Sequence, residues 1–143
     1  MVKAIKNSCG STVNNNATIQ CLTIKQLSNL SGLSAYTLRY YEKEGLIIGI
    51  RRNNAGHRCY SNNDMEWIEF LKRLKTTGMQ ITAMRRFAQL RKQGDKTISA
   101  RKEMLEIHQQ KVMAEISLLQ TNLAIITNKI KIYKKMEIAQ HNA

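Results

Sequence analysis

The chain has no proline, only three cysteines and only 10 acidic residues among its 143 residues. The cysteines have no C-x-x-C spacing, so the sequence predicts neither a zinc site nor a disulfide framework. No apolar run approaches the roughly 18 residues that a membrane-spanning helix needs. The N-terminal stretch is rich in Asn and Ser where a signal peptide would carry its apolar segment, so we expect a cytoplasmic protein that does not act at a membrane.

Motifs of catalysis are also missing. There is no glycine-rich phosphate loop and no H-E-x-x-H, and His57, His108 and His141 are far apart in the sequence. The acidic pairs, such as Glu42 and Glu44, are typical of charges on a helix surface. We therefore expect a protein that is not an enzyme and that has no metal site and no cofactor.

Positive charge is the dominant compositional feature. The formal net charge is +13 and the pI is about 10.0, and basic residues are spread along the chain rather than gathered in a tail. Such a surface attracts polyanions, of which nucleic acid is the commonest soluble one. Charge alone leaves two alternatives open, a solvated basic surface and binding to an anionic membrane.

The stretch 23–60 carries the signals of two short helices. Thr23 and Gln26 have the T-x-x-Q spacing of a capping box, and apolar residues then recur at helical spacing as far as Gly32, a favourable helix stop. Ser34 is placed to cap a second helix. Two helices joined by a glycine-containing turn are typical of a helix-turn-helix, whose second helix enters the major groove of DNA.

A hairpin is predicted after Gly45, where an apolar run, a polar Asn-Asn-Ala-Gly turn and a second short run follow one another. Its turn would carry three arginines, Arg51, Arg52 and Arg58. An arginine-bearing hairpin beside a recognition helix is a wing, and guanidinium groups suit phosphate oxygens. Two supporting helices should follow, one from Ser61 to about Thr76 and one ending near Gly94. We expect their outer faces to carry basic residues that add to the positive field, namely Lys72, Arg73, Lys75, Arg85 and Arg86.

A long helix is predicted from about residue 97 to residue 136, a range without glycine or proline. Apolar residues recur there at the a and d positions of a heptad repeat, which indicates a coiled coil with a second copy of the chain. The alternative is a helix lying on a membrane, but the seam is narrow for that role. The predicted dimerisation residues are Leu105, Val112, Ile116, Leu119, Leu123, Ile126 and Ile130.

The predicted fold is mainly α, with an N-terminal winged helix-turn-helix, a small β wing, two supporting helices and a long C-terminal coiled-coil helix. We divide the chain into a disordered extension at 1–21, a DNA-binding domain at 22–94, a dimerisation helix at 95–138 and a tail at 139–143.

The sequence TLRYYEKEGLI, followed by two arginines, GHRCYS and a capped helix, resembles the MerR family of transcriptional regulators. The similarity covers residues 23 to about 136. It implies an antiparallel coiled-coil homodimer that binds a pseudo-palindrome in an over-long promoter spacer and distorts it, so that RNA polymerase aligns with both promoter elements when an effector binds. The residues that it assigns to DNA binding are Ser34, Tyr36, Thr37, Arg39, Tyr40, Arg51, Arg52 and Arg58.

The chain also departs from the family pattern. His57 stands where tyrosine is usual, which we interpret as a structural substitution, and the step before the wing has no proline. The metal-sensing branch uses cysteines around the coiled coil, and this chain has no cysteine after Cys59. A short branch uses a cysteine in the third helix, where this chain has Arg73.

Cys59 therefore has two interpretations. It is either a small residue at a variable position of the wing or a thiol sensor, because the neighbouring positive charge favours a reactive thiolate. A non-specific, basic coiled-coil protein that coats DNA is the alternative to the sequence-specific regulator.

Overall fold

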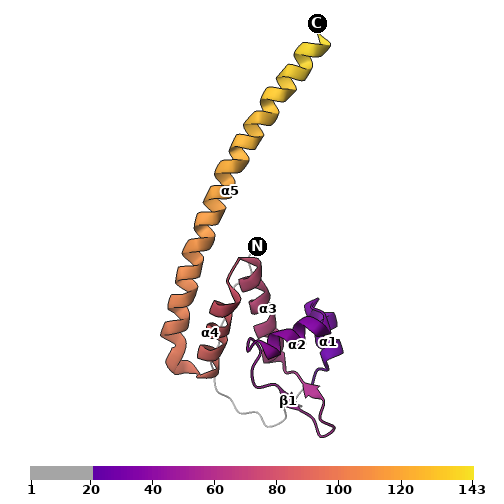
Figure 1. The fold of residues 1–143 in the computed structure, drawn as a ribbon, viewed down its shortest axis with the longest axis vertical. Coiled ribbons are helices and arrows are strands. Elements are labelled where there is room, and N and C mark those ends of the chain that lie inside the picture. The colour runs from indigo at the N-terminus through magenta and orange to yellow at the C-terminus, as the bar shows by residue number, and fades with distance from the viewer. Residues whose placement is uncertain (1–20) are drawn as a thin grey trace.

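The computed structural model describes residues 21–143 and is mainly helical, as predicted (Figure 1). Its elements are α1 (Ile24–Ser31), α2 (Ala35–Lys43), β1 (Arg51–Arg52), β2 (Arg58–Cys59), α3 (Asn62–Thr76), α4 (Ile81–Lys92), the short 3-10 helix η1 (Asp95–Thr97) and α5 (Ile98–His141). Of the predicted N-terminal extension, residues 1–20 lie outside the described part. Cys21 is within the described part.

The helix starts agree with the capping signals. The Thr23 hydroxyl accepts a hydrogen bond from the Gln26 amide at 3.1 Å, and the Gln26 side chain accepts one from the Thr23 amide at 2.9 Å. Gly32 ends α1 with φ of 74°, a left-handed conformation that costs glycine little. Ser61 and Asp64 form a second capping box at the start of α3. These local bonds satisfy amides that have no partner within the helices.

The hydrophobic core lies between the helix-turn-helix and the two supporting helices. Leu27, Leu38, Ile68 and Leu71 are completely buried in it. Trp67 of α3 donates a hydrogen bond from Nε1 to the Leu46 carbonyl at 2.8 Å, and its ring stacks on that of Phe87 with centroids 5.8 Å apart. The core thus fixes α1 and α2 on α3 and α4.

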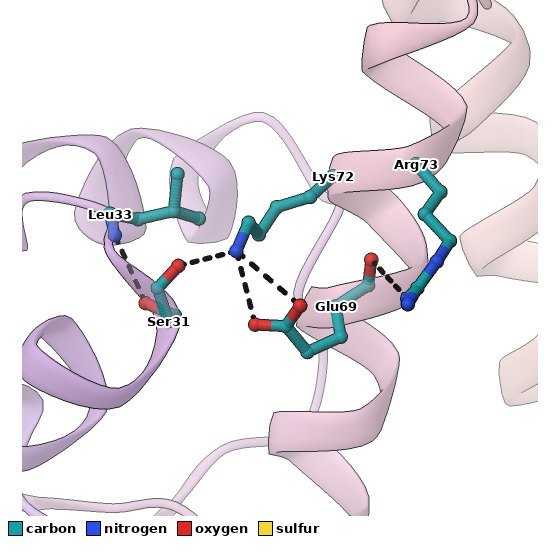
Figure 2. A network of polar contacts seen from close by, with 5 residues as sticks. All are labelled: Ser31, Leu33, Glu69, Lys72 and Arg73. Atoms are coloured by element: carbon teal, nitrogen blue, oxygen red, sulfur yellow. Dashed lines mark hydrogen bonds and ion pairs between the residues drawn. The ribbon is translucent and has the colours of Figure 1, made fainter.

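Lys72 of α3 holds the end of α1 (Figure 2). Its Nζ donates to the Ser31 carbonyl at 2.5 Å and contacts both carboxylate oxygens of Glu69 at 3.1 and 3.3 Å. A cation suits this place because the C-terminal end of a helix is negatively polarised. We expected Lys72 to lie on the outer face of α3, which is wrong: it is half-buried, and its charge is bound by the Ser31 carbonyl and the Glu69 carboxylate.

The long helix α5 has 44 residues and, at 1.5 Å per residue, is about 66 Å long. Its first turns pack on α4, with Met104 and Leu105 half-buried against the core. From Met113 onward every residue is exposed, and the helix runs alone away from the other elements (Figure 1). The expected tail is partly wrong, because 139–141 continue the helix.

Candidate nucleic-acid interface

One face of α2 is solvent-exposed and carries three of the side chains predicted to contact DNA, together with Lys43, which the sequence reasoning did not assign. Tyr36, Arg39, Tyr40 and Lys43 have the spacing of residues that share one side of a helix, and all four are exposed, Tyr36 to 79%. Leu38 and Tyr41 lie on the opposite side and are buried. The burial of one side of α2 therefore orients the other side outward.

Ser34 and Thr37 have a second role at the start of α2. The Ser34 hydroxyl accepts a hydrogen bond from the Thr37 amide at 3.1 Å, and the two hydroxyls are 2.9 Å apart. Both side chains therefore take part in the N-terminal cap. Their predicted contact with DNA stays a prediction, and the cap explains why the sequence has them at this place even without DNA.

The predicted wing is confirmed as an antiparallel hairpin in which Arg51 pairs with Cys59 and Arg52 with Arg58. The Asn53 side chain closes the turn by accepting hydrogen bonds from the amides of Ala55 and His57, each at 3.0 Å. Arg52 donates from its guanidinium to the Gly56 carbonyl at 2.8 Å. The turn is thus braced by one side chain from its first arm, Arg52, and one from the turn itself, Asn53.

The three wing arginines differ in what they contact. Arg58 is half-buried and binds Glu42 of α2, with 2.6 Å between its Nε and a carboxylate oxygen. Arg52 is bound within the turn, whereas Arg51 is exposed and has no ion pair or side-chain hydrogen bond with the rest of the described chain. Arg58 therefore connects the wing to α2, and Arg51 is the wing arginine best placed to meet a phosphate.

The end of α2 is held by Arg85 of α4, which sequence reasoning missed. Arg85 donates from Nε to the Glu44 carbonyl at 2.7 Å and from its terminal nitrogen to the Glu44 carboxylate at 2.5 Å. We expected Arg85 to lie on the outer face of α4, which is wrong. Nothing in the sequence marks this contact, because Glu44 and Arg85 are 41 positions apart.

Replacing Arg85 by alanine is expected to lower the free energy of unfolding by about 1–2 kcal/mol, since it removes a charged hydrogen bond that is only partly screened by solvent. Arg86→Ala, the exposed neighbour with the same change of charge, should cost less than about 0.5 kcal/mol. Urea denaturation of both variants measures the difference. Equal destabilisation would show that the contact with Glu44 contributes nothing.

Cys21 and Cys59 form a disulfide, and their Cα atoms are 4.8 Å apart. The expectation of unpaired thiols is therefore wrong for these two residues. The spacing of the cysteines does not indicate this bond, because the partners are 38 positions apart. The chain between them forms the whole helix-turn-helix and wing. Cys9 lies outside the described residues.

Tyr60 lies beneath the wing and is 1% exposed. Its backbone exchanges two hydrogen bonds with Leu22, of 2.8 and 2.9 Å. Its hydroxyl is buried without a hydrogen-bond partner in the described part of the chain. Burial, reinforced by the charge of Glu42, raises the pKa of the Tyr60 phenol above its usual value of 10.0.

Tyr60→Phe is expected to raise the free energy of unfolding at pH 7 by up to about 1 kcal/mol, because the variant no longer buries an unpaired hydroxyl. Because the pKa of the Tyr60 phenol is raised in the folded parent, the parent gains stability that is fully present below pH 10. This stability is lost as the pH rises through the folded-state pKa. The advantage of the variant should therefore grow above pH 10. Urea denaturation at pH 7 and pH 10.5 tests this, with the exposed Tyr36→Phe as control. The prediction is contradicted if the free energies of unfolding of the parent and of Tyr60→Phe differ by the same amount at both pH values.

The described residues contain no cluster of three or more His, Cys, Asp or Glu side chains that could hold a metal ion. In the same range, no helix combines the length and apolar character needed to cross a membrane.

Comparison with protein families gives a match over residues 22–91 to the MerR HTH family regulatory protein. An uncharacterized HTH-type transcriptional regulator of Haemophilus influenzae is 38% identical over 104 residues, which are 73% of this chain and 77% of the relative. The HTH-type transcriptional regulator AdhR of Bacillus subtilis is 39% identical over 92 residues, 64% of this chain and 66% of AdhR.

Solved structures show the same relationship. HiNmlR, a MerR family regulator lacking the sensor domain and bound to promoter DNA, superposes with a TM-score of 0.74 at 35% identity, over 80% of this chain and 91% of HiNmlR. A putative MerR family transcriptional regulator from Listeria monocytogenes gives a TM-score of 0.76 at 36% identity, over 79% and 86% of the two chains. With its helix-turn-helix, wing and long C-terminal helix, this chain belongs to the MerR family of transcriptional regulators.

Proposed function

We propose that the protein binds promoter DNA sequence-specifically as a homodimer and thereby regulates transcription. The observation that carries this proposal is the exposed face of α2 formed by Tyr36, Arg39, Tyr40 and Lys43, with the exposed Arg51 on the adjoining wing. Arg39 has no ion-pair partner among residues 21–143. Its guanidinium is therefore free to bind a base edge or a phosphate.

We assign direct reading of bases to α2 and contact with phosphates to both α2 and the wing. A helix fits the major groove, where arginine binds guanine through two parallel hydrogen bonds. The tyrosine hydroxyls of α2 and Arg51 of the wing suit phosphate oxygens, which set position and register rather than sequence. The pair between Arg58 and Glu42, 2.6 Å long, keeps the two elements in a fixed relation.

The second protomer is proposed to cover the exposed apolar side of α5. Ile116, Leu119, Leu123, Ile126 and Ile130 alternate at spacings of three and four residues and are 49–68% exposed. Fully covering one such side chain contributes about 1.5–3 kcal/mol. Each of the two helices contributes these five side chains. The summed free energy of burying them is therefore comparable with or larger than the roughly 4–15 kcal/mol that association costs.

Leu105 and Val112 belong less clearly to this seam. Leu105 packs against the core of its own chain, and Val112 is half-buried. We therefore place the main dimer contact beyond Val112, on the part of α5 that is free of its own domain.

A two-fold dimer presents two α2 helices to a pseudo-palindromic site. We further propose that the dimer binds between promoter elements and distorts the spacer, controlling how RNA polymerase engages it, as the family resemblance implies. Distortion would let DNA shape add to specificity at base pairs that the protein does not touch.

The experiment is a footprint of the full chain on the DNA immediately upstream of its own coding sequence, with excess competitor DNA and at two salt concentrations. The proposal predicts a two-fold protected patch between promoter elements that persists at moderate salt. Diffuse protection that disappears with competitor or salt would indicate the alternative, a basic protein that coats DNA through phosphate contacts alone.

A further inference from the structure

The disulfide lies at the base of the wing and joins it to the segment that leads into α1. Cys59 is half-buried and is the residue paired with Arg51 across the hairpin, whereas Cys21 is exposed. We propose that Cys21 and Cys59 form a reversible redox site whose closure fixes the base of the wing and so strengthens DNA binding. Its effect on DNA rests on the proposed function, but the redox site itself does not.

The backbone places the two cysteines together independently of the bond. Leu22 and Tyr60, their neighbours in sequence, exchange two backbone hydrogen bonds of 2.8 and 2.9 Å. The separation of 4.8 Å between the cysteine Cα atoms is within the range of ordinary disulfides. In the reduced protein the thiols therefore remain neighbours, and the bond can form and break without rearrangement of the core.

The surroundings favour the chemistry of exchange. Arg51 lies opposite Cys59, and Arg58 precedes it in the chain. Positive charge stabilises a thiolate, which is the form that attacks a disulfide. Arg58 is bound to Glu42, so Arg51 supplies the less compensated charge. Exposure of Cys21 gives a small oxidant access to the pair.

The reaction is a thiol–disulfide exchange with a low-molecular-weight disulfide. One protein thiolate attacks a sulfur of that molecule, forms a mixed disulfide and releases one small thiolate. The second protein thiolate then attacks the protein sulfur of the mixed disulfide and releases the other small thiolate. Two electrons pass from the cysteine pair to the small molecule, which becomes two thiols, and an excess of thiol reverses both steps.

The place of the bond argues for a signal rather than a permanent brace. A protein that binds promoter DNA works in a reducing compartment, where disulfides are rare and, when present, are usually transient and redox-sensing. The bond also adjoins the wing, whose exposed Arg51 is a proposed phosphate contact. Closing it removes freedom from this element before binding, and such preorganisation raises affinity.

The test uses the full chain with Cys9→Ser, so that only the proposed pair remains. The protein is equilibrated with oxidised glutathione or with dithiothreitol, and alkylation followed by mass measurement gives its state. Hydrogen exchange of residues 51–60 and the melting temperature report on the wing and the fold. Fluorescence anisotropy with a duplex from upstream of the coding sequence gives the affinity for DNA.

We expect the oxidised protein to exchange more slowly over residues 51–60, to melt about 5–15 °C higher and to bind the duplex about 3–10-fold more tightly. Cys21→Ser and Cys59→Ser, each in the same background, should not respond to oxidised glutathione. The reduced form of the parent carries neither substitution, so it controls for misfolding of these variants.

Two results would overturn the proposal. The first is failure of glutathione to form the bond; the second is a bond that forms without changing exchange in the wing or affinity for DNA. Absence of specific DNA binding in both states would instead contradict the proposed function, while hydrogen exchange would still decide whether the redox site fixes the wing.

Discussion

Arg39→Ala is expected to weaken binding to the specific DNA site by about 10–100-fold, because one well-formed arginine contact with a base is worth about 1–3 kcal/mol. The reason lies in the geometry of α2. Arg39 is exposed, is free of ion pairs within residues 21–143 and is flanked on the same face by Tyr36 and Tyr40. Quantitative footprinting or anisotropy titration measures the loss.

Lys135→Ala is the matched control for Arg39→Ala. It removes the same charge from an exposed position of α5, at the outer side of the heptad repeat and far from α2 in the chain. It should change specific binding less than about threefold, through the general field alone. Equal losses in the two variants would mean that the protein binds DNA by charge and not by a contact made by Arg39.

The second large effect is expected for Ile126→Lys, which should convert the dimer to a monomer at micromolar concentration. Ile126 is 56% exposed in the isolated chain and lies on the proposed seam. The two-fold axis places the substitution in both copies, so two apolar contacts are lost and two ammonium groups would have to be desolvated between the helices. Sedimentation equilibrium or light scattering gives the mass.

Asn128→Lys introduces the same charge two positions further along α5, on the side facing away from the seam, and should remain dimeric. Specific DNA binding should fall with the dimer in Ile126→Lys and persist in Asn128→Lys. A parent chain that is monomeric at micromolar concentration, or dimers in both variants, would exclude the proposed seam.

The features predicted correctly from sequence are those that neighbouring residues determine. Thr23, Gln26, Ser34 and Ser61 cap the predicted helices because a side chain and an amide three residues apart suffice. The wing is also predicted from neighbouring residues, because the Asn-Asn-Ala-Gly sequence indicates its turn. The length of α5 follows from an unbroken heptad pattern, although the structure carries it on to His141.

The contacts that sequence did not reveal join residues distant in the chain. Lys72 binds the Ser31 carbonyl and Arg85 binds Glu44, both across 41 positions, and Arg58 binds Glu42 across 16. In sequence each is simply a basic residue in a basic protein, and we assigned these charges to the surface or to DNA. Only the packing of α3, α4 and the wing shows that they are paired within the protein.

The exposed apolar side of α5 also determines how DNA occupancy depends on the amount of protein in the cell. If each protomer needs a second one to cover that side, dimer concentration rises with the square of protomer concentration as long as monomers predominate. Occupancy of a site read by two α2 helices would then rise steeply over a narrow range of expression. The length and composition of one helix would thus turn a graded change in synthesis into a sharper change in transcription.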